Sequence, residues 1–356
     1  MAPAQLRRRQ VTGRDATQAA ASGAMTHAAV KPGHAPSNAK TSNAKTRDAV
    51  TDAVTHVDTP RDAEVVRLAL GAWWQTHARD LPWRFGRTTP WGVLVSEVMS
   101  QQTQMGRVVP YWQAWMARWP DAAALAAADK ADVITMWGRL GYPRRALRLR
   151  ECAHVVHERH ADTVPCDYDA LLDLPGVGDY TASAVLSFAY GRRVPVVDTN
   201  VRRVLSRVFR GEESLGGAAS PLERELAHLV LPADEAACVT WNQSVMELGA
   251  TVCTAKSPLC DVCPVRGRCA FLKAGRPGLG QRRTRPRQRF AGTDRQVRGL
   301  VLQALRDLPE GESTLPRARV EALWEDRFQL DACVAALDED GLIEILPGGA
   351  VRLPRG

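Results

Sequence analysis

The chain has 356 residues, which is enough for two or three domains that each bury a sizeable core. Its 47 lysines and arginines outnumber 39 acidic residues, and the formal net charge of +8 suits a polyanionic partner such as nucleic acid, although a solvated basic surface gives the same balance. No apolar run approaches the roughly 20 residues of a membrane span, and the N-terminus lacks the apolar stretch of a secretory signal, so neither a membrane protein nor a secreted protein is expected.

Residues 1–60 contain no phenylalanine, tryptophan or tyrosine and consist mostly of small and polar residues. Such a segment cannot bury enough apolar surface to offset the entropy that it would lose on ordering. Its content of arginine, alanine, threonine and serine is typical of transit peptides, but Asp15, Asp48 and several prolines and glycines weaken that interpretation. We therefore predict a disordered N-terminal extension.

Amphipathic stretches of helical periodicity follow one another from about residue 62 to residue 270, and alternating strand patterns are scarce. This pattern predicts an all-α core. The expected helices lie near 91–105, 107–118, 131–138, 145–159, 168–173, 180–190, 199–209, 221–230 and 241–251.

A basic segment follows the core at residues 273–290, and its prolines and glycines predict a linker. The five arginines between Arg282 and Arg289 either touch DNA phosphates or remain solvated. The sequence of the linker leaves both interpretations open.

The last segment, residues 291–356, predicts a small domain of its own. Apolar residues recur on one helix face over 297–308, and two further helices are expected near 316–325 and 329–338. A Pro-Gly-Gly turn between two short apolar runs predicts a hairpin. Three helices and a hairpin indicate a winged-helix-like domain.

Four of the eight cysteines lie within residues 253–269 with the spacing C-x6-C-x2-C-x5-C, whereas the others are scattered. A disulfide scaffold would spread its pairs through a small secreted domain, so this pattern indicates one metal site in a reducing cytoplasm. Four thiolates this close suit either a [4Fe-4S] cluster or a tetrahedral zinc ion, and the spacing alone leaves both open. The candidate ligands are Cys253, Cys260, Cys263 and Cys269.

A glycine-rich hairpin, Leu-Pro-Gly-Val-Gly at 174–178, stands between a short helix and an apolar helix that begins at Tyr180. In a helix-hairpin-helix layout the glycines allow close approach of the backbone, and N–H groups at the helix start hold a DNA phosphate. We expect Gly176, Val177 and Gly178 to make that contact. An ordinary turn between two helices is the alternative.

Asp198 follows an apolar run and opens the helix expected at 199–209. An aspartate in this position is first of all a helix N-cap. The helix N-terminus should also keep its carboxylate ionised, which suits the stabilisation of a nearby cation, and both roles can hold together.

Glu97 shares one face of an expected helix with Val93, Leu94 and Gln101. A carboxyl group on a partly apolar face should have a raised pKa and is suited to general acid catalysis. A salt-bridged or solvated glutamate is the alternative when the residue is considered by itself.

The helix-hairpin-helix, the aspartate about 20 residues later and the cysteine cluster together resemble the endonuclease III superfamily of DNA glycosylases. Four sequences resemble its MutY-type adenine glycosylases: S-E-V-M-S-Q-Q-T-Q at 96–104, L-P-W-R at 81–84, W-G-R-L-G-Y at 137–142 and N-Q-S-V-M-E-L-G-A at 242–250. The resemblance covers about 80–270 and favours [4Fe-4S] over zinc. It implies a glycosylase core over 61–272, with a six-helix barrel at about 82–193 and a cluster domain formed by 61–81 and 194–272.

The resemblance implies a monomer that acts in the cytoplasm on double-stranded DNA and removes a flipped adenine paired with 8-oxoguanine or guanine. Glu97 would protonate adenine N7 and later activate water, Asp198 would stabilise the oxocarbenium ion, and opposed pKa shifts of the two carboxyls would suit this division. Further positions also match the family. Tyr180 and Asn200 would order the sugar and Asp198, and the adenine pocket would contain Trp83, Arg84 and Glu247. The group near the oxidised guanine would consist of Gln102, Thr103, Leu140 and Tyr142, with Tyr142 wedging into the base stack.

The chain departs from the family pattern in several places. Tyr180 stands where bifunctional relatives carry a Schiff-base lysine, so we expect a monofunctional hydrolase. Pro143 replaces a second tyrosine after Tyr142, and Asp179 brings a negative charge to the hairpin. The segment 291–356 is too short for the Nudix-like domain with which relatives inspect the lesion, so we expect it to supply phosphate contacts only and its removal to weaken binding to all duplexes alike.

Three other functions compete with adenine excision. The first is an endonuclease-III-like lyase for oxidised pyrimidines, against which Tyr180 and the sequence around Glu97 argue. The second is a non-catalytic helix-hairpin-helix module that binds mismatched duplex. The third is a winged-helix regulator whose cluster senses redox state. Release of free adenine from a duplex would distinguish the first prediction from all three.

Overall fold

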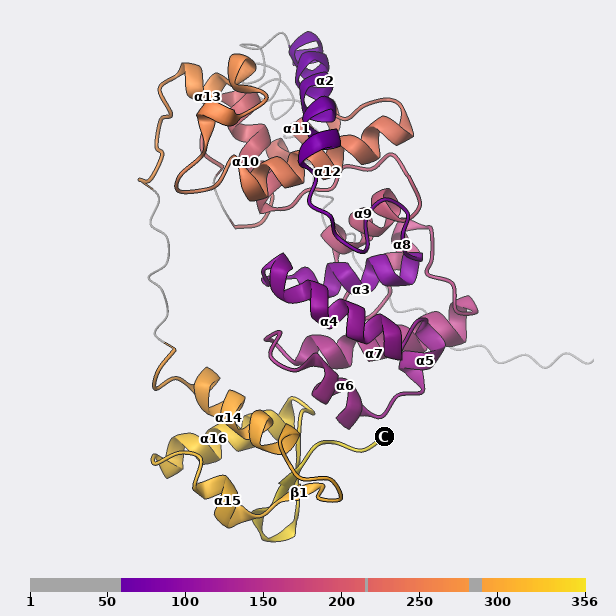
Figure 1. Cartoon of the computed structure of the whole chain (residues 1–356), viewed down its shortest axis with the longest axis vertical. Helices are drawn as coiled ribbons and strands as arrows, with labels where there is room; N and C mark the ends of the chain where they lie inside the picture. The colour runs from indigo at the N-terminus through magenta and orange to yellow at the C-terminus, as the bar shows by residue number, and fades with distance from the viewer. Residues whose placement is uncertain (1–58, 215–216, 282–289) are drawn as a thin grey trace, which may run out of the picture. The chain divides into compact units, whose positions relative to one another are not determined.

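The computed structural model describes residues 59–214, 217–281 and 290–356 (Figure 1). The N-terminal extension expected over 1–60 lies outside these residues except at its end, where helix α2 begins at Thr59, and the arginine-rich part of the linker at 282–289 also lies outside them. Helices dominate the described chain, which confirms the all-α class of the core. Among the described helices, none combines the length and the apolar composition needed to cross a bilayer.

The first apolar core is formed by a helical barrel that is rich in tryptophan. Trp115 and Trp137 are fully buried in it, and their rings meet edge to face with centroids 5.6 Å apart. The helices that contribute to this core are α3 (Pro90–Ser100), α4 (Met105–Arg118), α5 (Ala122–Ala126), α6 (Lys130–Trp137), α7 (Arg144–His160), α8 (Tyr168–Leu172) and α9 (Asp179–Phe188).

The second apolar core brings distant parts of the chain together, because α2 (Thr59–His77) packs on α12 (Glu235–Thr251) (Figure 1). The other elements around it are α10 (Thr199–Leu205), the π-helix η1 (Ser206–Arg210), α11 (Pro221–Leu229), the short turns η2 (Cys260–Val262) and η3 (Arg266–Arg268), and α13 (Ala270–Lys273). The polypeptide therefore leaves the second core after α2, builds the barrel and returns.

The C-terminal residues form a third apolar core of their own. The elements are α14 (Asp294–Arg306), β1 (Thr314–Leu315), α15 (Arg317–Glu321), α16 (Arg327–Glu339), β2 (Glu344–Ile345), η4 (Pro347–Gly349) and β3 (Val351–Arg352). The strands form an antiparallel sheet in the order β1-β3-β2, with Leu315 opposite Val351 and Val351 opposite Ile345. This order of helices and strands is that of a winged helix.

Two helices of the core have a boundary that differs by several residues from the one expected from periodicity. The helix expected at 91–105 ends at Ser100, because Gln101 is extended and Gln102 has a positive φ of 55°. The helix expected at 241–251 starts earlier, at Glu235, where the Asp234 side chain caps it by accepting from the Ala237 N–H. Helix α5 and strand β1 were not expected, because the AAALA sequence of α5 has no amphipathic pattern and β1 has only two residues.

Candidate active site

Glu97 lies in the middle of α3, a helix whose residues from Trp91 to Met99 are all buried. Its carboxyl is 8% exposed, and burial is the main reason that the pKa of Glu97 rises from 4.5 to about 7. The Tyr180 hydroxyl, which donates to Glu97 Oε2 at 2.8 Å, opposes that rise, whereas the charge of Asp198 adds to it. The predicted raised pKa is confirmed.

Tyr180 enters the site from α9, 83 residues after Glu97 in the chain. Burial and the neighbouring carboxylates raise the pKa of Tyr180 well above 10, so its phenol stays protonated and remains a hydrogen-bond donor. At this position the phenol offers a proton donor and no amine.

Asp198 is the N-cap of α10, as expected: its Oδ1 accepts from the Val201 N–H at 2.6 Å, and its Oδ2 accepts from the Asn200 side-chain amide at 2.8 Å. The helix start lowers the pKa of Asp198 as expected, but the net shift is upward, so the two carboxyls do not have opposed shifts. Burial raises the pKa of Asp198, and its hydrogen bonds offset that rise only in part. Both carboxyls therefore have raised pKa values. The negative charge of Asp198 raises the pKa of Glu97, so Asp198 is the carboxyl that ionises first.

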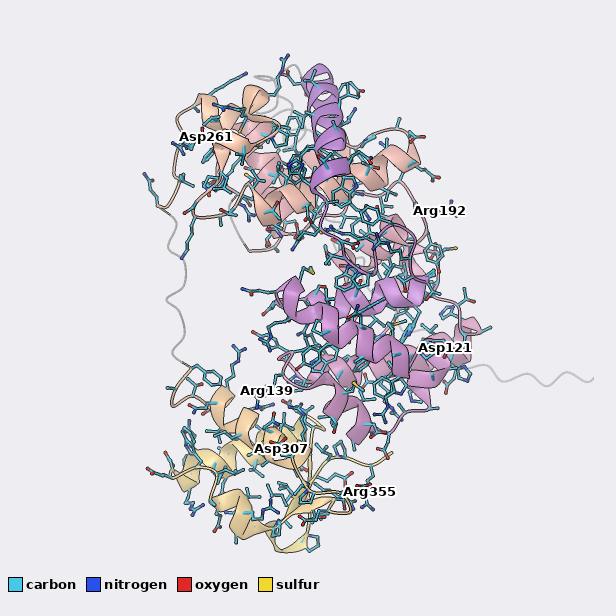
Figure 2. The ribbon with its side chains drawn as sticks, in the orientation of Figure 1. Asp121, Arg139, Arg192, Asp261, Asp307 and Arg355 are labelled. Carbon is cyan, nitrogen blue, oxygen red and sulfur yellow. The ribbon has the colours of Figure 1, made fainter. Side chains whose placement is uncertain are left out.

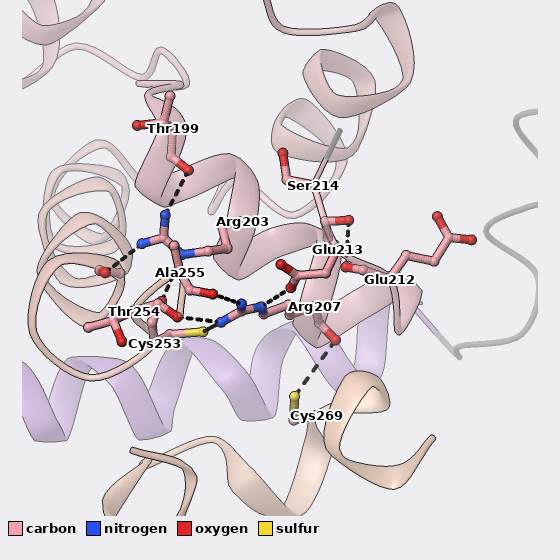
Figure 3. A network of polar contacts seen from close by, with 12 residues as sticks. Thr199, Arg203, Arg207, Glu212, Glu213, Ser214, Cys253, Thr254, Ala255 and Cys269 are labelled. Carbon is pink, nitrogen blue, oxygen red and sulfur yellow. Dashed lines mark hydrogen bonds and ion pairs between the residues drawn. The ribbon is translucent and has the colours of Figure 1, made fainter. Parts of the chain in front are cut away.

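Arg203 connects the Asp198 side of the site to the cysteine loop (Figure 3). One Nη of Arg203 donates to Asn200 Oδ1 at 2.8 Å and to the Gly249 carbonyl at 2.6 Å, while Nε donates to the Cys253 carbonyl at 2.8 Å. A side chain on Gly249 would come within 2.7 Å of the Asn200 Cβ, so α10 and α12 approach as closely as their backbones allow. Sequence analysis missed Arg203, which belongs to no motif that points to it.

The three residues expected in the adenine pocket are held by one another and by the core. Glu247 is fully buried, and its two oxygens pair with Arg79 at 2.5 Å and Arg84 at 2.8 Å. The Arg84 guanidinium lies 4.8 Å from the Trp74 ring, and Trp83 packs against Trp112 inside the barrel. Both carboxylate oxygens of Glu247 are thus engaged by guanidinium groups, and Glu247 fixes the position of Arg84.

The four residues expected near the oxidised guanine lie in two neighbouring turns, 101–104 and 138–143. The Thr103 hydroxyl donates to the Leu140 carbonyl at 3.3 Å, which ties the turns together. Gln102 and Tyr142 both have a positive φ, of 55° and 49°, and the Tyr142 side chain is 51% exposed. The structure therefore brings Gln102, Thr103, Leu140 and Tyr142 together, with the tyrosine ring facing solvent.

Arg145 holds these two turns in place, and sequence analysis missed it. Its Nη1 donates to the carbonyls of Val98 and Gln101, each at 2.7 Å, and its Nη2 donates to the Gly141 carbonyl at 3.0 Å. These bonds satisfy carbonyls that the end of α3 leaves without helical partners. Arg145 thereby fixes the loop on which Gln102 and Thr103 lie.

The hairpin has the geometry that the helix-hairpin-helix interpretation requires. Gly176 has a φ of 80°, and Gly178 is the N-cap of α9 without a side chain to compete for the N–H groups at the helix start. The charge of Asp179 is engaged: its carboxylate accepts from the Tyr168 hydroxyl and lies 3.5 Å from Arg224. Arg224 thus offsets the negative charge that distinguishes this hairpin.

The four cysteines of the expected cluster line one pocket, together with Arg207 and Phe271. Burial raises the pKa of the Cys263 thiol to about 11, and the other three thiols add to that rise because they lie close by. Within the described ranges, no three cysteine, histidine or acidic side chains converge tightly enough to hold a single metal ion. Four cysteine thiols around one pocket are the donor set that a [4Fe-4S] cluster requires.

Arg207, placed by the π-helix after α10, closes this pocket from inside (Figure 3). It is 1% exposed and forms an ion pair with Glu213. Its Nη1 donates to Cys253 Sγ at 3.4 Å, and its guanidinium lies 5.0 Å from the Phe271 ring. A cation bonded to a ligand sulfur stabilises the negative charge that a thiolate-bound cluster carries.

Comparison with known proteins agrees with this arrangement. A family model described as the HhH-GPD superfamily of base excision DNA repair proteins matches residues 95–230, and one described as the iron–sulfur binding domain of endonuclease III matches residues 253–269. A thermostable thymine-DNA glycosylase of known structure is 28% identical, with a TM-score of 0.56 over 60% of this chain and 98% of that chain. A non-covalent endonuclease III–DNA complex, 23% identical, has the same fold with a TM-score of 0.51 over 60% and 97% of the two chains.

Fold and site together define a helix-hairpin-helix DNA N-glycosylase of base excision repair that binds DNA and carries a [4Fe-4S] cluster. The adenine DNA glycosylase of Mycolicibacterium smegmatis is 50% identical over 285 residues, which are 79% of this chain and 93% of that protein. The adenine DNA glycosylase of Mycobacterium tuberculosis strain H37Rv is 46% identical over 80% of this chain and 91% of that protein. The human adenine DNA glycosylase is 41% identical over 57% of this chain and 38% of the human protein. The chain belongs to the adenine DNA glycosylase family.

Proposed function

We propose that this enzyme hydrolyses the N-glycosidic bond of adenine paired with 8-oxoguanine or guanine in double-stranded DNA. The observation that carries the proposal is the group formed by buried Glu97 and partly buried Tyr180 and Asp198, in which the pKa of Glu97 is raised to about 7. Support for adenine as the base comes from membership of the adenine DNA glycosylase family. The adenosine must flip out of the base stack to reach this group.

In the proposed reaction, protonated Glu97 donates its proton to adenine N7, which makes the base a better leaving group. The C1′–N9 bond then breaks toward an oxocarbenium ion, and the Asp198 carboxylate, held by Val201 and Asn200, stabilises that cation. Ionised Glu97 next accepts a proton from the water that attacks C1′. Tyr180 keeps Glu97 oriented through its hydroxyl.

We also propose that the enzyme is monofunctional. Schiff-base chemistry requires an amine at the attacking position, and the residue that faces Glu97 there is the phenol of Tyr180. The product is then an intact strand with an abasic site. We further propose that the protein acts as a monomer in the cytoplasm, where cysteines outside the cluster stay reduced.

The test incubates the protein with duplexes that contain adenine opposite 8-oxoguanine, adenine opposite guanine or thymine opposite guanine. We expect free adenine from the first two duplexes and strand cleavage only after alkali. Strand cleavage without alkali, together with a borohydride-trapped complex in good yield, would contradict the monofunctional mechanism. Thymine release with no adenine release would contradict the proposed substrate.

A further inference from the structure

Helix α14 of the C-terminal domain contacts the barrel. The Ile134 side chain of α6 is fully buried in the apolar core of the small domain, and the Ile134 carbonyl accepts from Arg306 Nε at 3.2 Å. Arg139, labelled in Figure 2, donates to Gln303 Oε1 at 3.1 Å. Arg306 and Gln303 both lie on α14, so this helix contacts α6 and the turn that follows α6.

The charge of the small domain indicates that it contacts protein here rather than phosphate. Residues 291–356 contain eight arginines and twelve acidic residues and no lysine, a net charge of −4. Asp340 pairs with Arg144 of α7 at 3.1 Å, so an acidic group of this domain meets the basic surface of the barrel. A net negative domain is repelled by the DNA backbone, which argues against the expected role in phosphate binding.

Arg295, in the first turn of α14, meets the proposed lesion-reading group. Its guanidinium carbon lies 5.5 Å from the centre of the Tyr142 ring. Arg295 is exposed, and it forms no hydrogen bond or ion pair with another residue of the described chain. The guanidinium carbon of Arg145 lies 5.6 Å from the same ring, so two cations contact one half-exposed tyrosine.

We propose that Arg295 is a positioning residue for Tyr142, through which the small domain takes part in discriminating 8-oxoguanine from guanine without touching the base. This inference rests on the proposed role of Tyr142 in the base stack. A half-exposed tyrosine has several accessible rotamers, and a cation held over its face restricts them. A ring whose rotamers are already restricted loses less entropy when it inserts into DNA.

The activity test compares Arg295→Ala with Arg295→Lys and with a matched control, Arg319→Ala. Arg319 belongs to the same domain and carries the same charge, but it pairs with Glu312. Single-turnover adenine release is measured opposite 8-oxoguanine and opposite guanine. We expect Arg295→Ala to reduce the preference for 8-oxoguanine by about two- to fivefold, Arg295→Lys to restore part of it and Arg319→Ala to leave it unchanged.

A double-mutant cycle isolates the contact. If Arg295 acts through the tyrosine ring, Tyr142→Ala with Arg295→Ala has the same preference as Tyr142→Ala alone. Independent losses that multiply in the double variant would overturn the proposal.

A spectroscopic readout on DNA-free protein keeps this inference separate from the proposed function. The chain has five tyrosines, so ring-labelled tyrosine gives a short NMR spectrum in which Tyr142→Phe assigns one signal. We expect that signal to move in Arg295→Ala and not in Arg319→Ala. An unmoved signal, or a moved signal with unchanged preference, overturns the role of Arg295. Absence of adenine release by the wild type is instead a failure of the proposed function, and the ring signal then still decides whether Arg295 holds Tyr142.

Discussion

At the scale of single residues, the proposed chemistry depends on two carboxyls that are not equivalent, buried Glu97 and partly buried Asp198. Glu97 has only a phenol as its direct hydrogen-bond donor, whereas Asp198 accepts from a backbone N–H and a side-chain amide. Donors stabilise the charged form of a carboxyl, so Asp198 ionises first and its charge helps keep the proton on Glu97. This inequality is what assigns the acid role to Glu97.

Glu97→Gln should abolish adenine release while binding to mismatched duplex survives. Glutamine preserves the size of the side chain and can still accept from Tyr180, but it has no carboxyl proton to give. Single-turnover release and a binding titration on the same duplex measure the two properties. Near-normal turnover in this variant would exclude Glu97 as the acid.

The rate should fall as pH rises through about 7, because the acid must be protonated. The same pKa rise, from 4.5 to about 7, makes the folded protein bind a proton more tightly than the unfolded chain does. The stability of the wild type should therefore fall by about 3 kcal/mol between pH 4.5 and 7 on account of Glu97 and change little above pH 7. Glu97→Gln removes that loss, so its melting temperature relative to the wild type should be higher at pH 8 than at pH 4.5. Equal differences at the two pH values would exclude a raised pKa.

Asp198→Asn should slow adenine release by about a hundredfold or more, because a charge that faces a developing cation is lost. Stability should change little, since asparagine caps a helix as well as aspartate does. Asp234→Asn is the matched control, because Asp234 caps α12 in the same way, accepting from Ala237. If Asp198→Asn changes only the melting temperature, Asp198 is merely a cap.

At the scale of elements, α10 and the π-helix that follows it serve two sites. The N-terminus of α10 presents Asp198, and the same stretch carries Arg203 and Arg207, which bond to the backbone and the sulfur of Cys253. In a π-helix each backbone hydrogen bond spans one residue more than in an α-helix, which changes the direction of the side chains that follow. Here the π-helix places Arg207 beside the cysteine loop. The order of the cluster loop and the orientation of Asn200 therefore depend on the same helix.

The purified protein should be brown and contain about four irons. Cys260→Ser removes one of the four thiols of the pocket and should lower the iron content and the thermal stability together. Cys166→Ser is the control, because Cys166 is exposed and lies outside the pocket; it should keep its full iron content. Stoichiometric zinc without iron in the wild type would contradict the assignment.

At the scale of the whole molecule, charge is distributed unevenly along the chain. The net charge of +8 combines −4 in residues 291–356 with +12 in residues 1–290. Attraction to the DNA backbone therefore comes from the glycosylase core with the residues on either side of it, and the small domain reduces it. The contacts of α14 with Ile134 and Arg139 place this acidic domain beside the turn that carries Tyr142.

Removal of residues 291–356 should lower the preference for 8-oxoguanine over guanine without weakening binding to undamaged duplex, even at low salt. The physical reason is that truncation removes Arg295 from Tyr142 and, at the same time, removes net negative charge. This replaces the expectation of an equal loss for all duplexes. Binding titrations over a range of salt concentrations measure both effects. An equal loss on every duplex would restore the earlier expectation.

The sequence by itself determined the helical class, the four clustered cysteines and the glycine-rich hairpin, and it singled out Glu97 and Asp198 as candidate site residues. These features are local, because helical period, ligand spacing and glycine placement each act over a few residues. The family resemblance added roles that periodicity cannot supply, such as those of Gln102 and Tyr142. Strand β1 escaped because two residues carry no period, and α5 escaped because its sequence, AAALA, has a single leucine among alanines and no amphipathic pattern.

Only the tertiary structure decided how these residues act on one another. It brought Tyr180 onto Glu97 across 83 residues and raised the pKa of Asp198 by burial, against the sign that its position at a helix start suggests. It also revealed Arg145, Arg203 and Arg295, which belong to no motif. The physical reason is that burial and the geometry of a guanidinium among carbonyls and rings depend on segments distant in the chain, and no local pattern records which segments those are.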